Sequence, residues 1–208
     1  MVTEPRAMSD APGCGEFAHR TSWCCQTRGV GITVIALLRG INVGGHNKLP
    51  MVQLREIAAS IGLADVQTYI QSGNLVGSTD GDPSAVGPVL AQAITSTTGL
   101  TVPVIVRTGD EWAALVSANP FAAVVEPGRH VHVICLPAPA SDSLHGFDTS
   151  GFAPEECAVV GSEIYLHLPH GLGRSKLVIA VNRYPDAAAG TARNWNTVQQ
   201  LAELAQPS

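Results

Sequence analysis

Lysine is almost absent from this chain, and charged residues are scarce in general. Lys48 and Lys176 are the only lysines among its 208 residues, and Asp, Glu, Lys and Arg together make up 14%. The net charge of -5 argues against a protein that coats nucleic acid non-specifically, because such binding usually depends on a basic surface. Aromatic residues contribute 5%, but hydrophobic residues contribute 45%, which is enough to bury a sizeable core.

The sequence also lacks an apolar run of about 20 residues, the length that a membrane-spanning helix needs. Residues 1–29 carry charges and prolines and contain no apolar h-region of a signal peptide. The five cysteines are an odd number, which suggests reduced thiols. We therefore expect a cytoplasmic protein without a membrane partner, while the sequence gives no indication of its oligomeric state.

Residues 1–31 show no helical or strand periodicity, which predicts a flexible N-terminal extension. Cys14, His19, Cys24 and Cys25 lie in this segment, but their spacing fits no standard zinc site. We predict neither a metal nor a cofactor. Because no apolar stripe in the segment could join a core, deleting residues 1–30 should leave folding intact.

Hydrophobic periodicity predicts two successive halves with similar element order. In the first half, residues 32–118, we expect strands at 32–38, 66–71, 75–78 and 102–107, with helices at 50–62, 83–99 and 110–118. In the second half, residues 119–208, we expect strands at 130–136, 158–160, 164–168 and 191–193, with helices near 141, from 175 and at 195–204. Both orders approximate β-α-β-β-α-β. We predict an α+β fold of two ferredoxin-like halves packed together, with an extra C-terminal helix.

Four segments combine glycine with many polar side chains: LLRGINVGGHNKLPM (37–51), YIQSGN (69–74), GLGRSKL (171–177) and TARNWNTV (191–198). In this order they resemble the signature segments of the domain-of-unknown-function 1697 family, and the resemblance covers residues 32–205. Gly77 departs from the family pattern, which more often has a bulky strand residue there. The resemblance implies a two-subdomain α+β fold and no established activity.

Two of these loops follow a predicted strand and open a predicted helix, and each contains one of the two lysines. Unpaired backbone N–H groups and the helix dipole favour an anion at such a place. We therefore predict binding of a phosphorylated or anionic ligand, namely a nucleotide, a single-stranded nucleic acid or a phosphometabolite. The candidate ligand-binding residues are Arg39, Gly40, Asn42, Gly44, Gly45, Lys48, Gln71, Ser72, Asn74, Arg174, Ser175, Lys176, Arg193, Asn194 and Asn196.

Other functions remain open on the same residues. Neither loop is a Walker or dinucleotide fingerprint, and the four motifs contain no Asp or Glu. An enzyme would use His46 as acid or base, because it is the only motif side chain expected to titrate near neutrality. A structural or interaction module would use the asparagines and glycines for turns and caps. Trp195 is expected in the core, with base stacking as its alternative role. Glu155 is expected to be a solvated charge or a helix cap.

The placement of the loops follows from the expected topology. We expect the first and third strands of each half to be parallel, so that the loops leaving them lie at the same end of a sheet. On that basis the Lys48, Lys176 and Arg193 regions should converge on one cleft, with the Ser72-Gly73-Asn74 turn at the opposite end of the first half.

Overall fold

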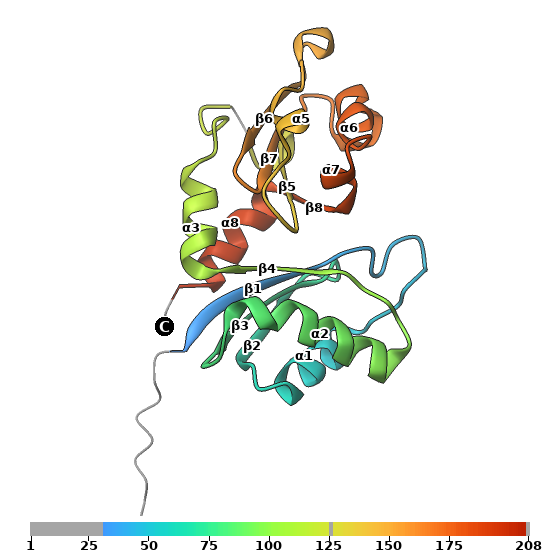
Figure 1. Cartoon of the computed structure of the whole chain (residues 1–208), viewed down its shortest axis with the longest axis vertical. Helices are drawn as coiled ribbons and strands as arrows, with labels where there is room; N and C mark the ends of the chain where they lie inside the picture. The colour runs from blue at the N-terminus through green and yellow to red at the C-terminus, as the bar shows by residue number, and fades with distance from the viewer. Residues whose placement is uncertain (1–30, 125–126, 207–208) are drawn as a thin grey trace, which may run out of the picture.

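The computed structural model describes residues 31–124 and 127–206 (Figure 1). The predicted N-terminal extension, with its four possible zinc ligands, therefore lies outside the described residues apart from Gly31. The first half contains β1 (Ile32–Leu38), α1 (Met51–Ser60), β2 (Ala64–Tyr69), β3 (Asn74–Thr79), α2 (Pro83–Thr98), β4 (Val104–Thr108) and α3 (Gly109–Ser117). Each predicted element of this half is present, with bounds shifted by up to two residues.

The second half begins with α4 (Pro127–His130), a short helix that the sequence did not predict. It continues with β5 (Val131–Cys135), α5 (Asp142–His145), the 3-10 turn η1 (Ser150–Phe152), β6 (Glu156–Val160) and β7 (Glu163–His167). It ends with the 3-10 turn η2 (Leu172–Arg174), α6 (Lys176–Val181), α7 (Pro185–Ala189), β8 (Thr191–Asn194) and α8 (Trp195–Leu204). The predicted helix from 175 is thus two short helices, and α7 was missed.

The strands form two four-stranded antiparallel sheets with the same neighbour order, β2-β3-β1-β4 and β6-β7-β5-β8. The protein is therefore a mixed α+β fold. The expectation that the first and third strands are parallel is wrong, since β1 pairs antiparallel with β3 and Leu37 lies opposite Asn74. The loop that leaves β1 and the Ser72-Gly73-Asn74 turn that enters β3 consequently lie at the same end of the first sheet.

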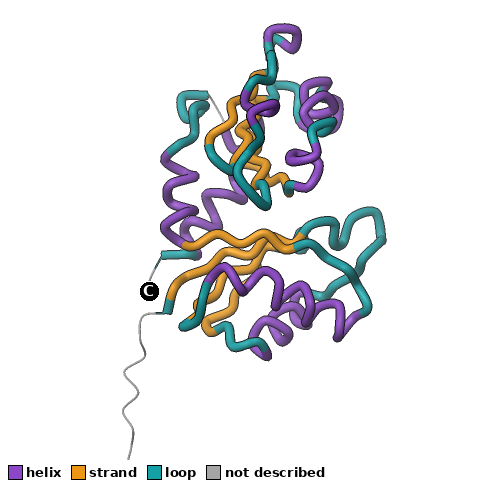
Figure 2. Tube along the Cα trace, in the orientation of Figure 1, coloured by secondary structure: helices purple, strands orange, loops and turns teal. Residues whose placement is uncertain are grey.

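Helices cover both outer faces of the two sheets, and the inner faces enclose a shared core (Figures 1 and 2). In Figure 1, α1 and α2 lie beneath the first sheet, while α6 and α7 lie beside the second. The shared core combines Ile35 and Leu37 of β1 with Val131 and Val133 of β5, and both α3 and α8 pack into it through Trp112, Leu115, Trp195, Val198 and Leu201. An extra helix thus follows the fourth strand in each half, at the places where the sequence predicted helices over 110–118 and 195–204.

The connection between the third and fourth strands differs between the halves. In the first half it is the 16-residue α2, whose Gly87 packs so closely on β4 that an added Cβ would lie 3.3 Å from the Val104 carbonyl oxygen. In the second half it is divided between α6, of six residues, and α7, of five. Pro185 at the first position of α7 explains the break, because the residue before a proline disfavours helical backbone.

No helix in residues 31–124 and 127–206 is both long and apolar enough to span a bilayer.

Candidate functional site

The first Gly-rich loop is held by its own asparagine. The Asn42 amide donates to the carbonyl oxygens of Leu49, at 3.0 Å, and of Gln71, at 2.8 Å, and its Oδ1 accepts from the Leu49 N–H at 2.9 Å. Asn42 itself has φ 55°, and Gly40, Gly44 and Gly45 also have positive φ. These residues therefore shape the loop, and the Asn42 side chain has its donors and acceptor occupied.

Arg193, predicted to contact phosphate, is buried between the two halves. Its Nε donates to Oδ1 of Asn74, and its Nη2 donates to the Leu38 carbonyl at 3.0 Å and the Gly73 carbonyl at 3.3 Å. Its Nη1 donates to Oγ1 of Thr191 at 2.7 Å. Burial lowers the pKa of the guanidinium to about 10. Arg193 and the fully buried Asn74 thus fasten β8 to the ends of β1 and β3 instead of facing a ligand.

Arg107 makes the equivalent contact from the first half to the second, whereas Arg193 belongs to the second half and contacts the first. It lies on β4 opposite Ile35, as Arg193 lies on β8 opposite Val133. Its Nε donates to Glu163 at 3.0 Å, and its Nη2 donates to the Leu136 carbonyl at 2.8 Å. Glu163 is the first residue of β7, as Asn74 is the first residue of β3.

We call these two arrangements the arginine clamps. In each clamp, an arginine of one half contacts the end of the hairpin in the other half. The residue after each arginine is the N-cap of an inner helix, Thr108 for α3 and Asn194 for α8. The arginine-and-cap pair was visible in the sequence, but it was not recognised as a repeat.

The predicted anion site at Lys176 is filled by the protein itself. The Leu177 N–H donates to Oε2 of Glu155 at 3.0 Å, and the Val178 N–H donates to Oγ of Ser175 at 2.9 Å. A carboxylate at a helix N-terminus is the electrostatic partner that the helix dipole favours. Glu155 is therefore a helix cap, one of the two roles expected for it, and its carboxylate already occupies the place that an anion would take.

The remaining motif residues divide into caps and exposed side chains. Asn194 caps α8 by accepting from the Thr197 N–H at 2.8 Å, and Trp195 is in the shared core as expected. Asn196 packs against α4, where a Cβ added to Gly128 would lie 1.8 Å from its Oδ1. His46 is exposed in a turn bridged to Val43.

The remaining motif residues either bond within the protein or are exposed, and one exposed residue lines a cavity. Ser72 uses its hydroxyl to accept from the Asn74 amide at 3.0 Å, and Gln71 offers its backbone carbonyl to Asn42. The side chains of Arg39, Lys48, Arg174 and Lys176 are exposed. Of these four cations, Arg39 alone lines the cavity described next.

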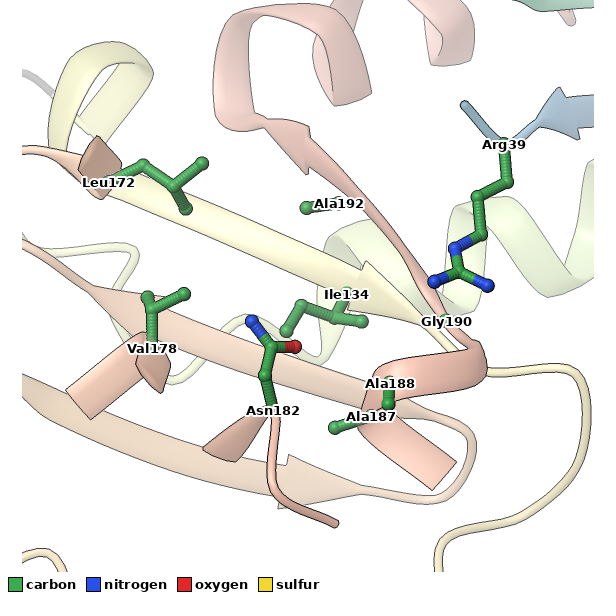
Figure 3. Close-up of a pocket in the computed structure, with 9 residues that line it drawn as sticks. All are labelled: Arg39, Ile134, Leu172, Val178, Asn182, Ala187, Ala188, Gly190 and Ala192. Carbon is green, nitrogen blue, oxygen red and sulfur yellow. The ribbon is translucent and has the colours of Figure 1, made fainter. Parts of the chain in front are cut away.

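A cavity of about 300 Å³ lies where the second half meets Arg39 (Figure 3). It is lined mainly by apolar side chains and backbone of β5, η2, α6, α7 and β8, namely Ile134, Leu172, Val178, Ala187, Ala188, Gly190 and Ala192, together with Asn182 and Arg39. In Figure 3 the Arg39 guanidinium enters from the end of β1 and points towards the turn at Gly190. The cavity lies at the break in the crossover, because residues of both α6 and α7 contribute to its lining.

The backbone around Arg39 is fixed although its side chain is exposed. The Arg39 N–H donates to the Pro103 carbonyl at 3.0 Å, and the preceding carbonyl, of Leu38, accepts from Arg193. The two ion pairs among the described residues join Arg107 to Glu163 and His167 to Glu156, so the Arg39 guanidinium takes part in neither. An arginine on a fixed backbone, with its donors directed over an apolar cavity, is able to receive an anionic group.

The single cleft predicted from the four motifs is only partly present. Arg39 of the first loop and Leu172 of the third line the same cavity, whereas Lys48 and Lys176 do not. Arg193 reaches the Asn74 turn, which was expected at the opposite end of the sheet. Sequence reasoning missed Asn182 and the alanines of α7, because nothing in a short alanine-rich segment marks it as the wall of a cavity.

The titratable side chains elsewhere are better explained by burial than by chemistry. Among residues 31–124 and 127–206, no group of three or more His, Cys, Asp or Glu side chains is placed to hold a metal ion. His130, His132 and His167 are half-buried on or beside strands, whereas His170 is exposed. Burial raises the pKa of the Cys135 thiol to about 12 and lowers that of His132.

Comparison with known proteins agrees with the fold and gives no activity. The family model described as "Protein of unknown function (DUF1697)" matches residues 32–165. Among solved structures, the chain is similar to conserved bacterial protein SP0830 from Streptococcus pneumoniae, with a TM-score of 0.64 and 18% identity over 84% of this chain and 99% of that one. At this identity the likeness concerns the fold alone. No curated protein matches the chain.

Proposed function

We propose that this chain, which belongs to the DUF1697 family of proteins of unknown function, binds a small anionic ligand in the cavity beside Arg39. The observation that carries the proposal is the position of the Arg39 guanidinium, which lies at the cavity without an ion-pair partner among the described residues. A phosphorylated metabolite, a nucleotide and a single-stranded nucleic acid are the ligand classes predicted by the Gly-rich loops. Of the predicted binding residues, Arg39 remains the central one, since Asn42, Asn74 and Arg193 are occupied in structural contacts.

The proposal is binding rather than catalysis. His46, the candidate acid or base of the alternative hypothesis, is exposed and does not line the cavity. The third hypothesis, a structural role for the motifs, has support at Asn42, Asn74 and Asn194, whose side chains brace a loop, a turn and a helix. It does not account for Arg39, whose side chain has no such contact in the described part of the chain.

We also propose that the two halves, 32–118 and 119–208, are a ferredoxin-like duplication. The common strand order and the paired arginine clamps support this origin. A core shared by both sheets supports halves that fold as one unit. The free thiols of Cys135 and Cys157 are consistent with the predicted cytoplasmic location.

A thermal-shift screen of the full chain tests the proposed binding, because a ligand that binds only the native state raises its melting temperature. The screen would use nucleotides, phosphosugars, oligonucleotides and simple carboxylates, each with wild type and with Arg39→Gln. We expect at least one anion to stabilise wild type and to have a much smaller effect on Arg39→Gln. If every anion acts equally on both proteins, Arg39 is not the binding group and the proposal is wrong.

A further inference from the structure

We infer that the ligand is a short aliphatic carboxylate rather than a nucleotide or a nucleic acid. The inference rests on the proposed function, because it names the class of anion that the same cavity takes. Three properties of the lining lead to it: its charge, its polarity and its size.

The charge of the lining fits a single anionic group. Arg39 is the only cation among the lining residues, and no acidic side chain accompanies it. A guanidinium presents two parallel N–H donors that match the two oxygens of a carboxylate. A nucleoside triphosphate would bring several negative charges to one positive charge, and Lys48 and Lys176 do not line the cavity to balance them.

The polarity of the lining fits an aliphatic body. Ile134, Leu172 and Val178 contribute branched side chains, and the alanines of α7 and β8 contribute methyl groups. No aromatic ring lines the cavity, so a base would find nothing to stack on, whereas stacking supplies much of the affinity of single-stranded nucleic-acid sites. The exposed Asn182 amide is the one other polar side chain, and it offers a donor and an acceptor to a substituent such as a hydroxyl.

The size of the cavity sets an upper limit on the ligand. Its volume of about 300 Å³ is at the low end of the range for small-molecule sites. An apolar cavity of roughly 150 Å³ takes up benzene, so a cavity of this size suits a body of roughly six to twelve non-hydrogen atoms. Hexanoate falls in this range and has one carboxylate on an unbranched aliphatic chain, which makes it a suitable probe.

The test is calorimetric titration of the full chain with hexanoate, hexan-1-ol and ATP. Arg39→Gln removes the charge, with Arg183→Gln as its control, because Arg183 is an exposed arginine outside the lining. Ala188→Leu fills the cavity, with Ala189→Leu as its control, because Ala189 is the exposed neighbour on α7 that does not line it. Neither pair changes a fully buried side chain, so all four variants should fold.

We expect hexanoate to bind wild type and both controls alike, with a millimolar dissociation constant typical of so small a ligand. Arg39→Gln should weaken binding about tenfold to a hundredfold, as expected for a hydrogen-bonded charge, and Ala188→Leu should abolish it. Hexan-1-ol should bind much more weakly than hexanoate, because it has no carboxylate for Arg39.

Three results would overturn the inference. If ATP binds in an Arg39-dependent way and hexanoate does not, the ligand class is wrong although the proposed anion binding stands. If hexan-1-ol binds as well as hexanoate, the site recognises apolar bodies without using the charge. If hexanoate does not bind, or binds regardless of Arg39→Gln and Ala188→Leu, this cavity is not its site, and the thermal-shift screen then decides whether any anion uses Arg39.

Discussion

Replacing Arg193 with alanine should destabilise the protein strongly, because the side chain connects the two halves through buried groups. It is 8% exposed and donates to Asn74, Leu38 and Gly73 in the other half. Its loss removes the donor to Oδ1 of Asn74 and to the Leu38 carbonyl, whereas the Gly73 carbonyl still accepts from the Leu38 N–H. Each buried polar group left unsatisfied costs about 1–3 kcal/mol. Relief of the cost of burying a charge, and entry of water, offset part of this. We expect a net loss of about 3 kcal/mol, or roughly 6–12 °C in melting temperature for a chain of this size.

The other clamp provides a matched comparison. The Arg107 and Glu163 side chains are 13% and 15% exposed, so water can replace part of what Arg107 donates. Arg107→Ala should therefore cost less, about 1–2 kcal/mol. Arg193→Lys should cost nearly as much as Arg193→Ala, because a single ammonium cannot reproduce the planar set of donors that reaches separate acceptors.

Urea unfolding followed by far-ultraviolet circular dichroism measures these differences, with Asn74→Ala and the double variant completing a cycle. A coupling energy of about 1–3 kcal/mol between Arg193 and Asn74 is expected for a buried, charge-assisted contact. A loss below about 1 kcal/mol for Arg193→Ala, or a larger loss for Arg107→Ala, would refute the reasoning that burial makes this clamp the stronger one.

Three further perturbations follow from the described contacts. Glu155→Ala should lower the stability by about 1 kcal/mol, because it removes the cap of α6. Glu156→Ala, at the exposed neighbouring position, should change the stability by less than about 0.5 kcal/mol. If the two variants have equal melting temperatures, Glu155 does not act as a cap. Burial lowers the pKa of His132 in the folded state, so the unfolded state binds the extra proton and the stability should fall as the pH drops below about 6.5. Chemical unfolding at several pH values should show a smaller fall for His132→Gln than for wild type. If the stability of both proteins depends on pH with the same slope, this expectation is wrong. Burial raises the pKa values of the Cys135 and Cys157 thiols to about 12 and about 11. In a variant whose three cysteines before residue 31 are replaced by serine, thiol reagents should therefore label these two cysteines slowly until urea is added. Rapid labelling of the native protein would be inconsistent with the fold.

Local patterns in the sequence were sufficient to predict most of the elements. The apolar run at β1 and the spaced apolar residues of α1 and α2 each gave an element within two residues of its bounds. The sequence did not predict the short helices α4 and α7, because four or five residues are too few to show a helical period. Pro185 was the available sign that the crossover helix of the second half is interrupted.

Contacts between distant segments were beyond the reach of such patterns. Arg193 and Asn74 are 119 residues apart, and their contact depends on how one sheet packs against the other. The error in strand direction had a different origin, because the predicted element order already specifies it: a strand-helix-strand connection makes the first two strands parallel, and the hairpin that follows reverses the third. Motif residues rich in hydrogen-bonding groups were therefore interpreted as ligand contacts, although Asn42, Asn74 and Arg193 use those groups within the protein.

The candidate site lies where the two halves differ. Their common features, the strand order, the arginine clamps and the capped inner helices, stabilise the contact between the sheets and are satisfied within the chain. The interrupted crossover of the second half has no counterpart in the first, and it leaves an apolar cavity that the chain does not fill. Arg39 has its backbone fixed by the same clamp that joins the halves, yet its guanidinium is directed at this asymmetric region. A mutation in a clamp should therefore act on stability first and on binding through the position of Arg39, whereas a mutation of an exposed lining residue such as Arg39 or Ala188 should change binding alone.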